Sequence, residues 1–320
     1  MKLAILGLGI MGERLLRAAL THPGTTVSAV WDPAPEAAAR LAGITAGLGM
    51  APSAEAAIAT ADAVYVASPP ASHIAHGRAI LGAGKALFLE KPLASDVAAA
   101  RDFVTWAQGM RAAVNFPMAS SPATAQLLAW LPEIGALHAI EMSCAFANWP
   151  RGWQQAAASW LARRAEGGFT REVVSHFLFL AQRVGGPLTL LEGSADHPPG
   201  DGSEIASRAR LLAGSLPVTF SGHVGGTTLD ETNETRLIGT QGQIRLRDWS
   251  YAEKLGADGA WQPAADALPN SAMRPLTLAG QLDKLAALTR GEPTTLATLA
   301  EALAVQQAVE GILNGAGPTG

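Results

Sequence analysis

Two residues whose side chains can carry a proton, Glu90 and Lys91, directly follow an apolar run, Ala86 to Leu89. Pro92 comes next. A short, continuous apolar run is typical of a strand that is buried on both faces of a parallel sheet. Pro92 has no backbone N–H to donate to a neighbouring strand, so we expect the strand to end there. Open α/β sheets bind ligands at the carboxyl ends of their strands. The pattern therefore predicts that Glu90 and Lys91, which can carry a proton, lie at a ligand-binding edge.

A second pair, Glu172 and His176, stands four residues apart in a predicted helix over residues 170–184. A carboxylate one helical turn from an imidazole can orient it and raise its basicity. We therefore expect His176 to move a proton and Glu172 to orient it. The alternative is a surface ion pair or a packed histidine. Phe179 lies on the same predicted face and is expected to contact the substrate.

An aromatic segment over residues 148–153 supplies two further candidates, Trp149 and Trp153. Tryptophan faces pack well against the apolar side of a ring, so both are expected to bind substrate from a loop over a pocket. The alternative is packing in the core or in an interface. Nearby arginines could clamp a substrate carboxylate or could be solvated: Arg151, Arg163 and Arg164.

The start of the chain positions a second ligand-binding element. A predicted strand over residues 2–6 leads into Gly7-Leu8-Gly9-Ile10-Met11-Gly12 and then into a helical pattern through Leu20. The first glycine allows a tight turn, the second lets the backbone approach a pyrophosphate, and the third lets the helix lie close to the strand. The residues expected to hold the pyrophosphate are Gly7, Gly9, Ile10, Met11 and Gly12.

Asp32 ends the next predicted strand, residues 26–31, and lies 20 residues beyond Gly12. A carboxylate at this distance can accept hydrogen bonds from both hydroxyls of an adenosine ribose, and it would repel a 2'-phosphate. The nearest downstream base is Arg40, so we expect NAD in preference to NADP. The alternative is that Asp32 is a turn residue before a proline.

Strands and helices continue to alternate in the first half, which predicts a parallel sheet with right-handed crossovers. The expected helices are 34–42, 53–59 and 71–83, and a further strand is 62–67. Ser68, Pro69 and Pro70 close this strand at the ligand-binding edge. His73 follows and is expected at the nicotinamide end of the cofactor, with a solvated or capping histidine as the alternative.

The second half has a different period. Alternating apolar and polar residues predict an antiparallel sheet with one covered face, and the other face is expected to meet further subunits in a homodimer or homotetramer. The expected strands are 188–195, 205–213, 217–224, 233–240 and 242–247, and closing helices are expected at 277–289 and 295–314. We predict two domains, 1–117 and 118–320, with a carboxyl-terminal helix able to pack back on the first domain.

Composition narrows the class of protein. The 320 residues are 48% hydrophobic with a net charge of −4, and scattered basic residues give no footprint for nucleic acid or an anionic membrane. A single cysteine, Cys144, fits a reducing cytoplasm and a buried packing role, and we expect no metal. Three glycines interrupt the apolar start, so it does not read as a signal peptide. A cytoplasmic protein that binds a small molecule is expected.

These motifs together resemble the Gfo/Idh/MocA family of NAD(P)-dependent oxidoreductases. The resemblance rests on Gly7-x-Gly9-x-x-Gly12, Ser68-Pro69-Pro70-x-x-His73 and Gly84-Lys85-x-x-x-x-Glu90-Lys91-Pro92, and continues through 167–176, 237–242 and 302–305. It implies a Rossmann domain followed by an α+β domain with a large, open, mostly antiparallel sheet. It also implies a cis Lys91–Pro92 peptide, a catalytic Lys91 beside the nicotinamide, and Glu90 near the nicotinamide ribose.

Three departures from the family pattern bear on the substrate: Glu172 stands where aspartate is more frequent, Phe179 replaces a second acid, and Pro117 and Ala119 replace a frequent asparagine and arginine. We predict hydride transfer between nicotinamide and a secondary alcohol or carbonyl carbon of a small, polar, polyol- or sugar-like substrate, with Lys91 and His176 handling the proton. The alternatives are an imine reductase and an NAD-binding sensor without turnover. An S-adenosylmethionine enzyme would leave Glu90 and Lys91 unexplained.

Overall fold

The computed structural model describes residues 1–315, apart from the side chain of Ala156, and divides into two compact units. Unit 1 contains Met1–Ser120 and Pro275–Leu303, and unit 2 contains Ser121–Arg274 and the residues from Ala304 onward. The predicted domain boundary after residue 117 lies close to the first of these divisions. The segment 275–303 belongs to unit 1, so that unit is built from two separate parts of the chain.

Unit 1 contains a five-stranded parallel sheet in the order β2-β1-β3-β4-β5. The strands are β1 (Lys2–Leu6), β2 (Thr26–Trp31), β3 (Ala63–Val66), β4 (Ala86–Leu89) and β5 (Ala112–Val114). On the outer side of β2, Val30 forms an isolated parallel bridge with Met50. The chain crosses from one side of β1 to the other between β2 and β3, and such a switch point is where open α/β sheets bind ligands.

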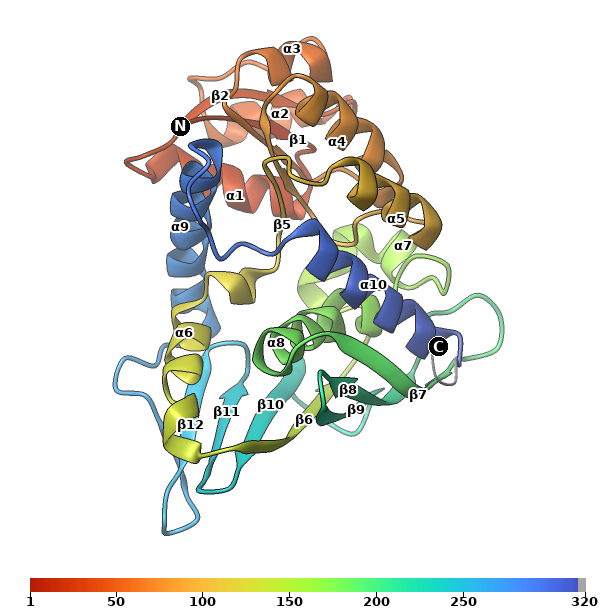
Figure 1. The fold of residues 1–320 in the computed structure, drawn as a ribbon. Helices are drawn as coiled ribbons and strands as arrows, with labels where there is room; N and C mark the ends of the chain where they lie inside the picture. Colours follow the sequence, from red (N-terminus) through yellow and green to blue (C-terminus); the bar gives the residue numbers. More distant parts are fainter. Residues whose placement is uncertain (316–320) are drawn as a thin grey trace. The chain divides into compact units, whose positions relative to one another are not determined.

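Helices cover both faces of this sheet, because every residue of β3 and β4 is buried. They are α1 (Ile10–Thr21), α2 (Ala37–Ile44), α3 (Ala54–Ala59), α4 (His73–Gly82), α5 (Val97–Trp106) and most of α9 (Asn270–Thr289). Figure 1 shows α9 beside α1, and Leu282 and Leu285 of α9 share a core cluster with Leu15 and Leu16. The carboxyl-terminal part of the chain therefore completes the amino-terminal core.

Unit 2 contains an eight-stranded sheet in the order β13-β12-β11-β10-β6-β9-β8-β7. Only β6 and β9 pair in parallel, so the prediction of a mostly antiparallel second sheet is confirmed. The strands are β6 (Leu137–Phe146), β7 (Leu188–Asp196), β8 (Ala206–Ala213), β9 (Leu216–Val224), β10 (Glu231–Gly239), β11 (Gln243–Arg247), β12 (Tyr251–Leu255) and β13 (Trp261–Pro263).

Strand β6 was not predicted, although it lies between β10 and β9 inside the sheet. Its signal was present in the sequence, because Ile140, Met142, Cys144 and Phe146 are buried and alternate with more exposed residues. The two short strands β12 and β13 were also missed. Cys144 packs as a small buried side chain in this row, and burial raises the pKa of its thiol.

Two helix predictions were wrong in detail. Helix α9 starts at Asn270 rather than after Pro275, because a proline near a helix start removes a single hydrogen bond and the helix continues through it. The predicted α-helix over 170–184 is a π-helical turn, η5 (Thr170–Val174), followed by α8 (Ser175–Gly185). Glu172 and His176 therefore do not stand on one regular α-helical turn.

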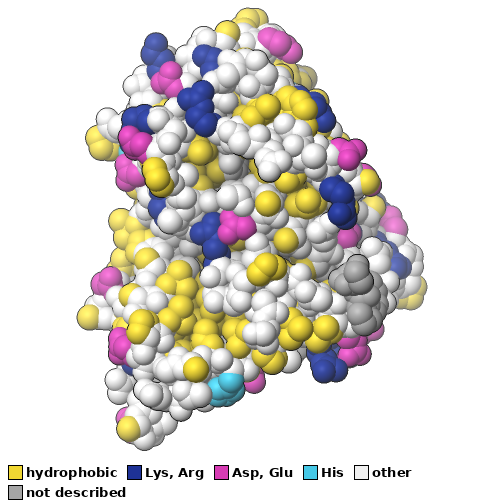
Figure 2. Space-filling view, viewed as in Figure 1, with side chains coloured by type: hydrophobic (Ala, Val, Ile, Leu, Met, Phe, Trp, Pro, Cys, Tyr) yellow, Lys and Arg dark blue, Asp and Glu magenta, His cyan; other side chains and the backbone are white. Residues whose placement is uncertain are grey.

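The remaining helices of unit 2 are short, apart from α10, and Figure 1 shows α8 lying over the eight-stranded sheet. They are α6 (Pro122–Ala129), α7 (Ala158–Leu161) and the second part of α10 (Leu299–Leu313). Within residues 1–315, the helices are too short or too polar to span a membrane. Over the same range, no three His, Cys, Asp or Glu side chains are grouped to hold a metal ion. Basic and acidic side chains are interspersed on the face shown in Figure 2.

Candidate active site

The glycine loop between β1 and α1 is shaped by two close backbone contacts. Gly7 has a φ of 93°, and a Cβ placed on it would lie 2.6 Å from the backbone of Ala67. A Cβ on Gly12 would lie 2.0 Å from the carbonyl oxygen of Gly7. Both distances are shorter than real carbon contacts, so only glycine fits either position. A Cβ on Gly9, in contrast, would meet nothing within 4 Å, which leaves open space in front of the loop.

This open space faces the amino end of α1, where Gly9 is the capping residue and has no side chain to bind the first N–H groups. The N–H groups of the first helical turn, including those of Ile10 and Met11, have no partner within the helix. Such an end attracts anions through its N–H groups and the helix dipole. The loop therefore fits the pyrophosphate of a dinucleotide, with Gly9, Ile10 and Met11 as the residues that would hold it.

Asp32 lies beside the same loop, immediately after β2. Its two carboxylate oxygens accept hydrogen bonds from the backbone N–H of Leu8, at 2.6 Å, and of Ala34, at 2.8 Å. Arg40 also reaches the loop, where it donates to the carbonyl oxygen of Leu8 at 2.6 Å. The distance of Arg40 from Asp32 in sequence was thus a poor guide, because α2 brings the guanidinium to the loop that Asp32 holds.

His73 is the first residue of α4 and is fully buried. Its Nδ1 and Nε2 each lie 2.8 Å from a backbone carbonyl oxygen, those of Pro92 and Ser68 respectively. Burial lowers the pKa of His73 and outweighs the two carbonyl contacts, which act in the opposite direction. The ring therefore joins the segments after β3 and β4, which favours a positioning role over direct contact with a nicotinamide. Ser68 and Ser72 share a hydrogen bond of 2.6 Å beside it, and Pro69 and Pro70 lead into α4.

Glu90 belongs to a chain of buried polar groups that the sequence did not reveal. The hydroxyl of Tyr65 in β3 donates to Glu90, and the amide of Asn115 donates to the same oxygen at 2.7 Å. The side chain of Gln281 in α9 donates in turn to Asn115. Burial and then the neighbouring Glu90 raise the pKa of Tyr65, so its hydroxyl stays protonated as a donor. These contacts fix the carboxylate at the end of β4 from three other elements.

Lys91 follows this fixed carboxylate and is half-buried. The Lys91–Pro92 peptide is cis, as the family resemblance implied, and a second cis peptide joins Trp149 and Pro150. The residues after β1, β3 and β4 lie at the carboxyl ends of neighbouring parallel strands, so the glycine loop, Ser68 and Lys91 share one edge of the sheet. Unit 1 thus brings the predicted cofactor and proton-carrying residues of the amino-terminal half to one edge.

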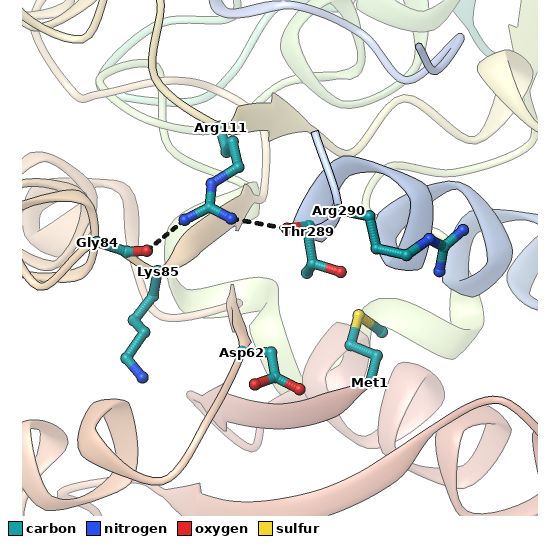
Figure 3. A pocket seen from close by; sticks show the side chains of 7 residues that line it. All are labelled: Met1, Asp62, Gly84, Lys85, Arg111, Thr289 and Arg290. Atoms are coloured by element: carbon teal, nitrogen blue, oxygen red, sulfur yellow. Dashed lines mark hydrogen bonds between the residues drawn. The ribbon is translucent and has the colours of Figure 1, made fainter. Parts of the chain in front are cut away.

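A cavity of about 380 Å³ lies at the opposite edge of this sheet (Figure 3). Its lining residues precede β1, β3, β4 and β5 or follow α9: Met1, Asp62, Gly84, Lys85, Arg111, Thr289 and Arg290. Arg111 crosses it to donate to the carbonyl oxygens of Gly84, at 2.6 Å, and Thr289, at 2.7 Å. The cavity is therefore a seam in which an arginine joins α9 to the sheet, away from the glycine loop.

In unit 2, His176 is almost completely buried and packs edge-on against Trp249, with ring centroids 5.4 Å apart. Phe177 contacts the same tryptophan at 5.1 Å. Trp249 has a φ of 70°, a left-handed conformation that is rare for a bulky residue and costs about 1 kcal/mol or more. Its backbone N–H donates to the side chain of Asn233 at 3.1 Å, which holds the strained turn. Strain of this kind clusters at functional sites.

Trp249 links His176 to a buried ion pair. The indole N–H of Trp249 donates to Glu231 at 2.7 Å, and the guanidinium of Arg151 donates to the other oxygen of Glu231 at 2.5 Å. Asn233 adds a third donor at 3.0 Å, and Gln154 accepts from Arg151 at 2.9 Å. We call these five residues the Arg151–Glu231 cluster. Sequence reasoning missed Glu231 and Trp249, because neither stands in a local motif.

The three aromatic residues of unit 2 that were predicted to bind substrate differ in their surroundings. Trp149 packs edge-on against Phe146 and donates to the carbonyl oxygen of Leu161 at 3.1 Å, so it belongs to the packing. Trp153 is 43% exposed and covers the guanidinium of Arg151 at 4.7 Å. Phe179 is 1% exposed, which favours core packing over contact with a substrate.

Two of the three arginines expected as carboxylate clamps are engaged with other side chains. Arg151 is committed to Glu231 and Gln154. Arg163 forms an exposed ion pair with Asp201. Both guanidinium groups therefore already contact side chains of this protein, which does not favour a role in binding a ligand.

Comparison with known proteins agrees with this arrangement. Residues 1–116 match the family described as "Oxidoreductase family, NAD-binding Rossmann fold", that is, Gfo/Idh/MocA. Over these 116 residues, the chain is similar to the Gfo/Idh/MocA family. An inositol 2-dehydrogenase of Cereibacter sphaeroides is 39% identical over 106 residues, which is 32% of either chain. The alignment thus spans about a third of that relative.

Solved structures match almost the whole chain in fold. An oxidoreductase from Agrobacterium radiobacter, in complex with NAD⁺, L-tartaric acid and magnesium, has a TM-score of 0.79 at 20% identity, covering 98% of this chain and 95% of that chain. A UDP-N-acetylglucosamine 3-dehydrogenase from Acidithiobacillus ferrooxidans has a TM-score of 0.76 at 17% identity, covering 98% and 99%. At these identities the likeness establishes the two-unit fold, and the predicted fold class is confirmed.

Proposed function

We propose that this protein is an NAD-dependent dehydrogenase that transfers a hydride between nicotinamide and a secondary alcohol or carbonyl carbon of a small polar substrate. The observation that carries the proposal is the shared edge of the unit 1 sheet. There, an open glycine loop that only glycine can form lies at the same strand ends as Lys91. A dinucleotide-binding loop and a lysine at the same edge of the sheet are the two elements that hydride transfer with an accompanying proton requires.

When bound, NAD supplies the hydride chemistry, and the chain must position the reactants and move a proton. In this proposal, Lys91 donates or accepts the proton of the substrate oxygen, and it directly follows Glu90, whose carboxylate is held by buried hydrogen bonds. His176 shares that role from unit 2, where Trp249 holds its ring, and Glu172 orients it from the π-helical turn.

The cofactor preference is part of the proposal. Asp32 is held at the glycine loop by two backbone N–H groups, which supports an adenosine ribose with a free 2'-hydroxyl. Arg40, however, is also at the loop, and it would become available to a 2'-phosphate if it left the Leu8 carbonyl. Fluorescence titration with NADH and NADPH tests this directly, and we expect tighter binding of NADH. Tighter binding of NADPH would contradict the assignment.

The substrate proposed is polyol- or sugar-like, in line with the inositol 2-dehydrogenase that is similar over 106 residues. An aromatic wall of Phe179 and the tryptophans would favour an imine substrate, and that support weakens because Phe179 and Trp149 pack within unit 2. The test is to follow NAD⁺ reduction with a panel of polyols and sugars, and NADH oxidation with cyclic imines. Turnover of the alcohols supports the proposal. Turnover of imines alone, or NADH binding without any turnover, would replace it with one of the two alternatives.

We further propose a cytoplasmic homo-oligomer that uses the open face of the eight-stranded sheet. That face carries ion pairs between neighbouring strands, among them Arg236 with Glu141 and Arg245 with Glu253. Because the charged side chains of neighbouring strands already pair with one another, a second subunit can cover this face without leaving a buried charge unpaired. Light scattering after gel filtration measures the assembly, and a monomer at micromolar concentration would contradict this part of the proposal.

A further inference from the structure

We propose that Gln281 is a positioning residue for the nicotinamide half of the cofactor, because it holds the Glu90 carboxylate in one orientation through Asn115. The inference deepens the proposed function and rests on it only for the identity of the cofactor. All the residues that carry the argument belong to unit 1. Gln281 lies in α9, the helix that joins the core of this unit from the carboxyl-terminal part of the chain.

Gln281 is a polar residue in apolar surroundings. It is 1% exposed, and Leu282 and Leu285 of the same helix are fully buried in the core cluster of unit 1. Among the residues that the structure describes, the Oε1 atom of Gln281 is buried and accepts no hydrogen bond. A buried amide oxygen without a donor lowers stability, and a leucine at this position would avoid that loss. The advantage of a glutamine here must therefore come from the N–H end of its amide.

The N–H end of Gln281 fixes the orientation of a second amide. Gln281 donates to the Oδ1 atom of Asn115. The Nδ2 atom of Asn115 is then the end that donates to Oε1 of Glu90, at 2.7 Å, and to the hydroxyl of Tyr65, at 3.3 Å. If this amide were reversed, its oxygen would face a carboxylate and its nitrogen would face another donor. The backbone N–H of Asn115 also donates to the carbonyl oxygen of Leu89 at 2.7 Å, directly before Glu90. The donors therefore run in one direction, from α9 to the carboxylate at the end of β4.

The order of the strands puts Glu90 on the nicotinamide side of the proposed cofactor. Asp32 follows β2, the glycine loop follows β1, and Glu90 follows β4. Since the sheet runs β2-β1-β3-β4, an adenosine ribose at Asp32 and a pyrophosphate at the glycine loop direct the rest of the dinucleotide past the end of β3 toward β4. A carboxylate at that end can accept hydrogen bonds from the hydroxyls of the second ribose, as Asp32 can from those of the first. The orientation of Glu90, which Gln281 and Asn115 set, then decides how well the nicotinamide half is held.

The experiment compares the binding of NADH and ADP by isothermal titration calorimetry. ADP carries the adenosine ribose and the pyrophosphate but lacks the nicotinamide half, so the ratio of the two Kd values isolates that half. In Gln281→Leu, we expect NADH to bind about 10-fold more weakly while ADP binds as it does to the wild type, because the change reaches the end of β4 and not the glycine loop. Asn115→Asp keeps an acceptor for Gln281 but turns a carboxylate oxygen toward Glu90, so the NADH affinity should fall about 10- to 100-fold.

Leu282→Ala is the matched control, since Leu282 is the next residue of α9 and is fully buried in the apolar core cluster. This variant should be less stable in urea, yet it should keep the wild-type ratio of NADH to ADP affinity. If Gln281 only stabilised the fold, Gln281→Leu would behave in the same way. Circular dichroism establishes that each variant is folded, and Gln281→Leu decides alone if Asn115→Asp does not fold.

Three outcomes overturn the inference: a wild-type protein that binds NADH no more tightly than ADP, a wild-type ratio of the two affinities in Gln281→Leu, or an equal loss of both in that variant. Failure of the proposed function looks different. A wild-type protein that binds NADH but oxidises none of the polyols and sugars would remove the dehydrogenase, and a selective loss of NADH affinity in Gln281→Leu would still leave the inference standing. Conversely, turnover of an alcohol together with an unchanged ratio in Gln281→Leu would preserve the dehydrogenase and remove the role of Gln281.

Discussion

The carboxyl edge of the unit 1 sheet and the Arg151–Glu231 cluster of unit 2 both bury a glutamate, but they hold it in different ways. Glu90 accepts from a phenol and an amide, which are neutral donors, and the backbone around it is regular apart from the cis peptide. Glu231 accepts from a guanidinium, an indole and an amide, beside a strained tryptophan and a second arginine.

This difference separates a general site from a specific one. The edge in unit 1 can position the same cofactor in any relative with the same loop, because its donors and its shape come from short motifs. The cluster in unit 2 carries backbone strain at Trp249, and such strain clusters at functional sites. We expect changes at the first site to affect cofactor binding and chemistry, and changes at the second to affect stability and substrate choice.

The largest expected effect is on catalysis at the first site. Lys91→Met removes the proposed proton carrier and should lower kcat by roughly 10²- to 10⁴-fold, the usual contribution of general acid–base catalysis. NADH affinity, measured by fluorescence titration, should change little, because the glycine loop and Asp32 are untouched. A variant that is folded, binds NADH and turns over at the wild-type rate would show that Lys91 has no catalytic role.

The next effect sharpens the comparison at the second site. Glu231→Gln leaves Arg151 without its negatively charged partner, and removing one partner of a largely buried ion pair costs roughly 3 kcal/mol of unfolding free energy. Urea denaturation measures it. The control is Glu192→Gln, whose ion pair with Arg210 is exposed and should cost less than about 1 kcal/mol. Equal losses in the two variants would mean that the cluster is no more than an ordinary surface pair.

A third test separates shape from ligand binding within the glycine loop. Gly12→Ala places a methyl group against the Gly7 carbonyl and should cost on the order of 2 kcal/mol of stability. The methyl group of Gly9→Ala meets no protein atom. The unfolding free energy of this variant, measured by urea denaturation, should therefore stay within about 0.5 kcal/mol of the wild type while NADH binding weakens. If Gly9→Ala binds NADH as the wild type does, the open space in front of α1 is not the pyrophosphate site.

The smallest expected effect is the pH dependence of unit 1. Burial lowers the pKa of His73 below its ordinary value of 6.5, so the unfolded chain takes up a proton on acidification before the folded protein does. The corresponding stability is complete above about pH 6.5 and is lost as the pH falls below that value.

Urea denaturation between neutral and mildly acidic pH tests the His73 effect. His73→Gln should be less stable at neutral pH, because two carbonyl contacts are lost, yet should show a flatter dependence on pH. The control His223→Gln replaces an exposed histidine and should keep the wild-type slope. An unchanged slope in His73→Gln would mean that another group causes the loss in acid.

Predictions from local patterns succeeded where one short stretch carries the whole signal. Strands β2 and β4 have the predicted limits, and the cis peptide at Lys91 agrees with the resemblance. They failed at two other elements. Strand β6 was overlooked although its alternation is clear, and Pro275 was read as a helix boundary when a helix runs through it. The π-helical turn before His176 has no sequence signal that we recognise.

The sequence by itself determined the cofactor half, because a strand, three glycines, Asp32 and Glu90-Lys91-Pro92 are local patterns whose geometry follows from backbone sterics and strand ends. Only the tertiary structure decided which groups surround them. Asn115 reaches Glu90, Gln281 reaches Asn115, and Arg40 reaches Leu8, from distant positions in the chain. Trp249 and Glu231 join Arg151 in the same way. Such contacts depend on which elements pack together, and packing is a property of the whole fold rather than of any one segment.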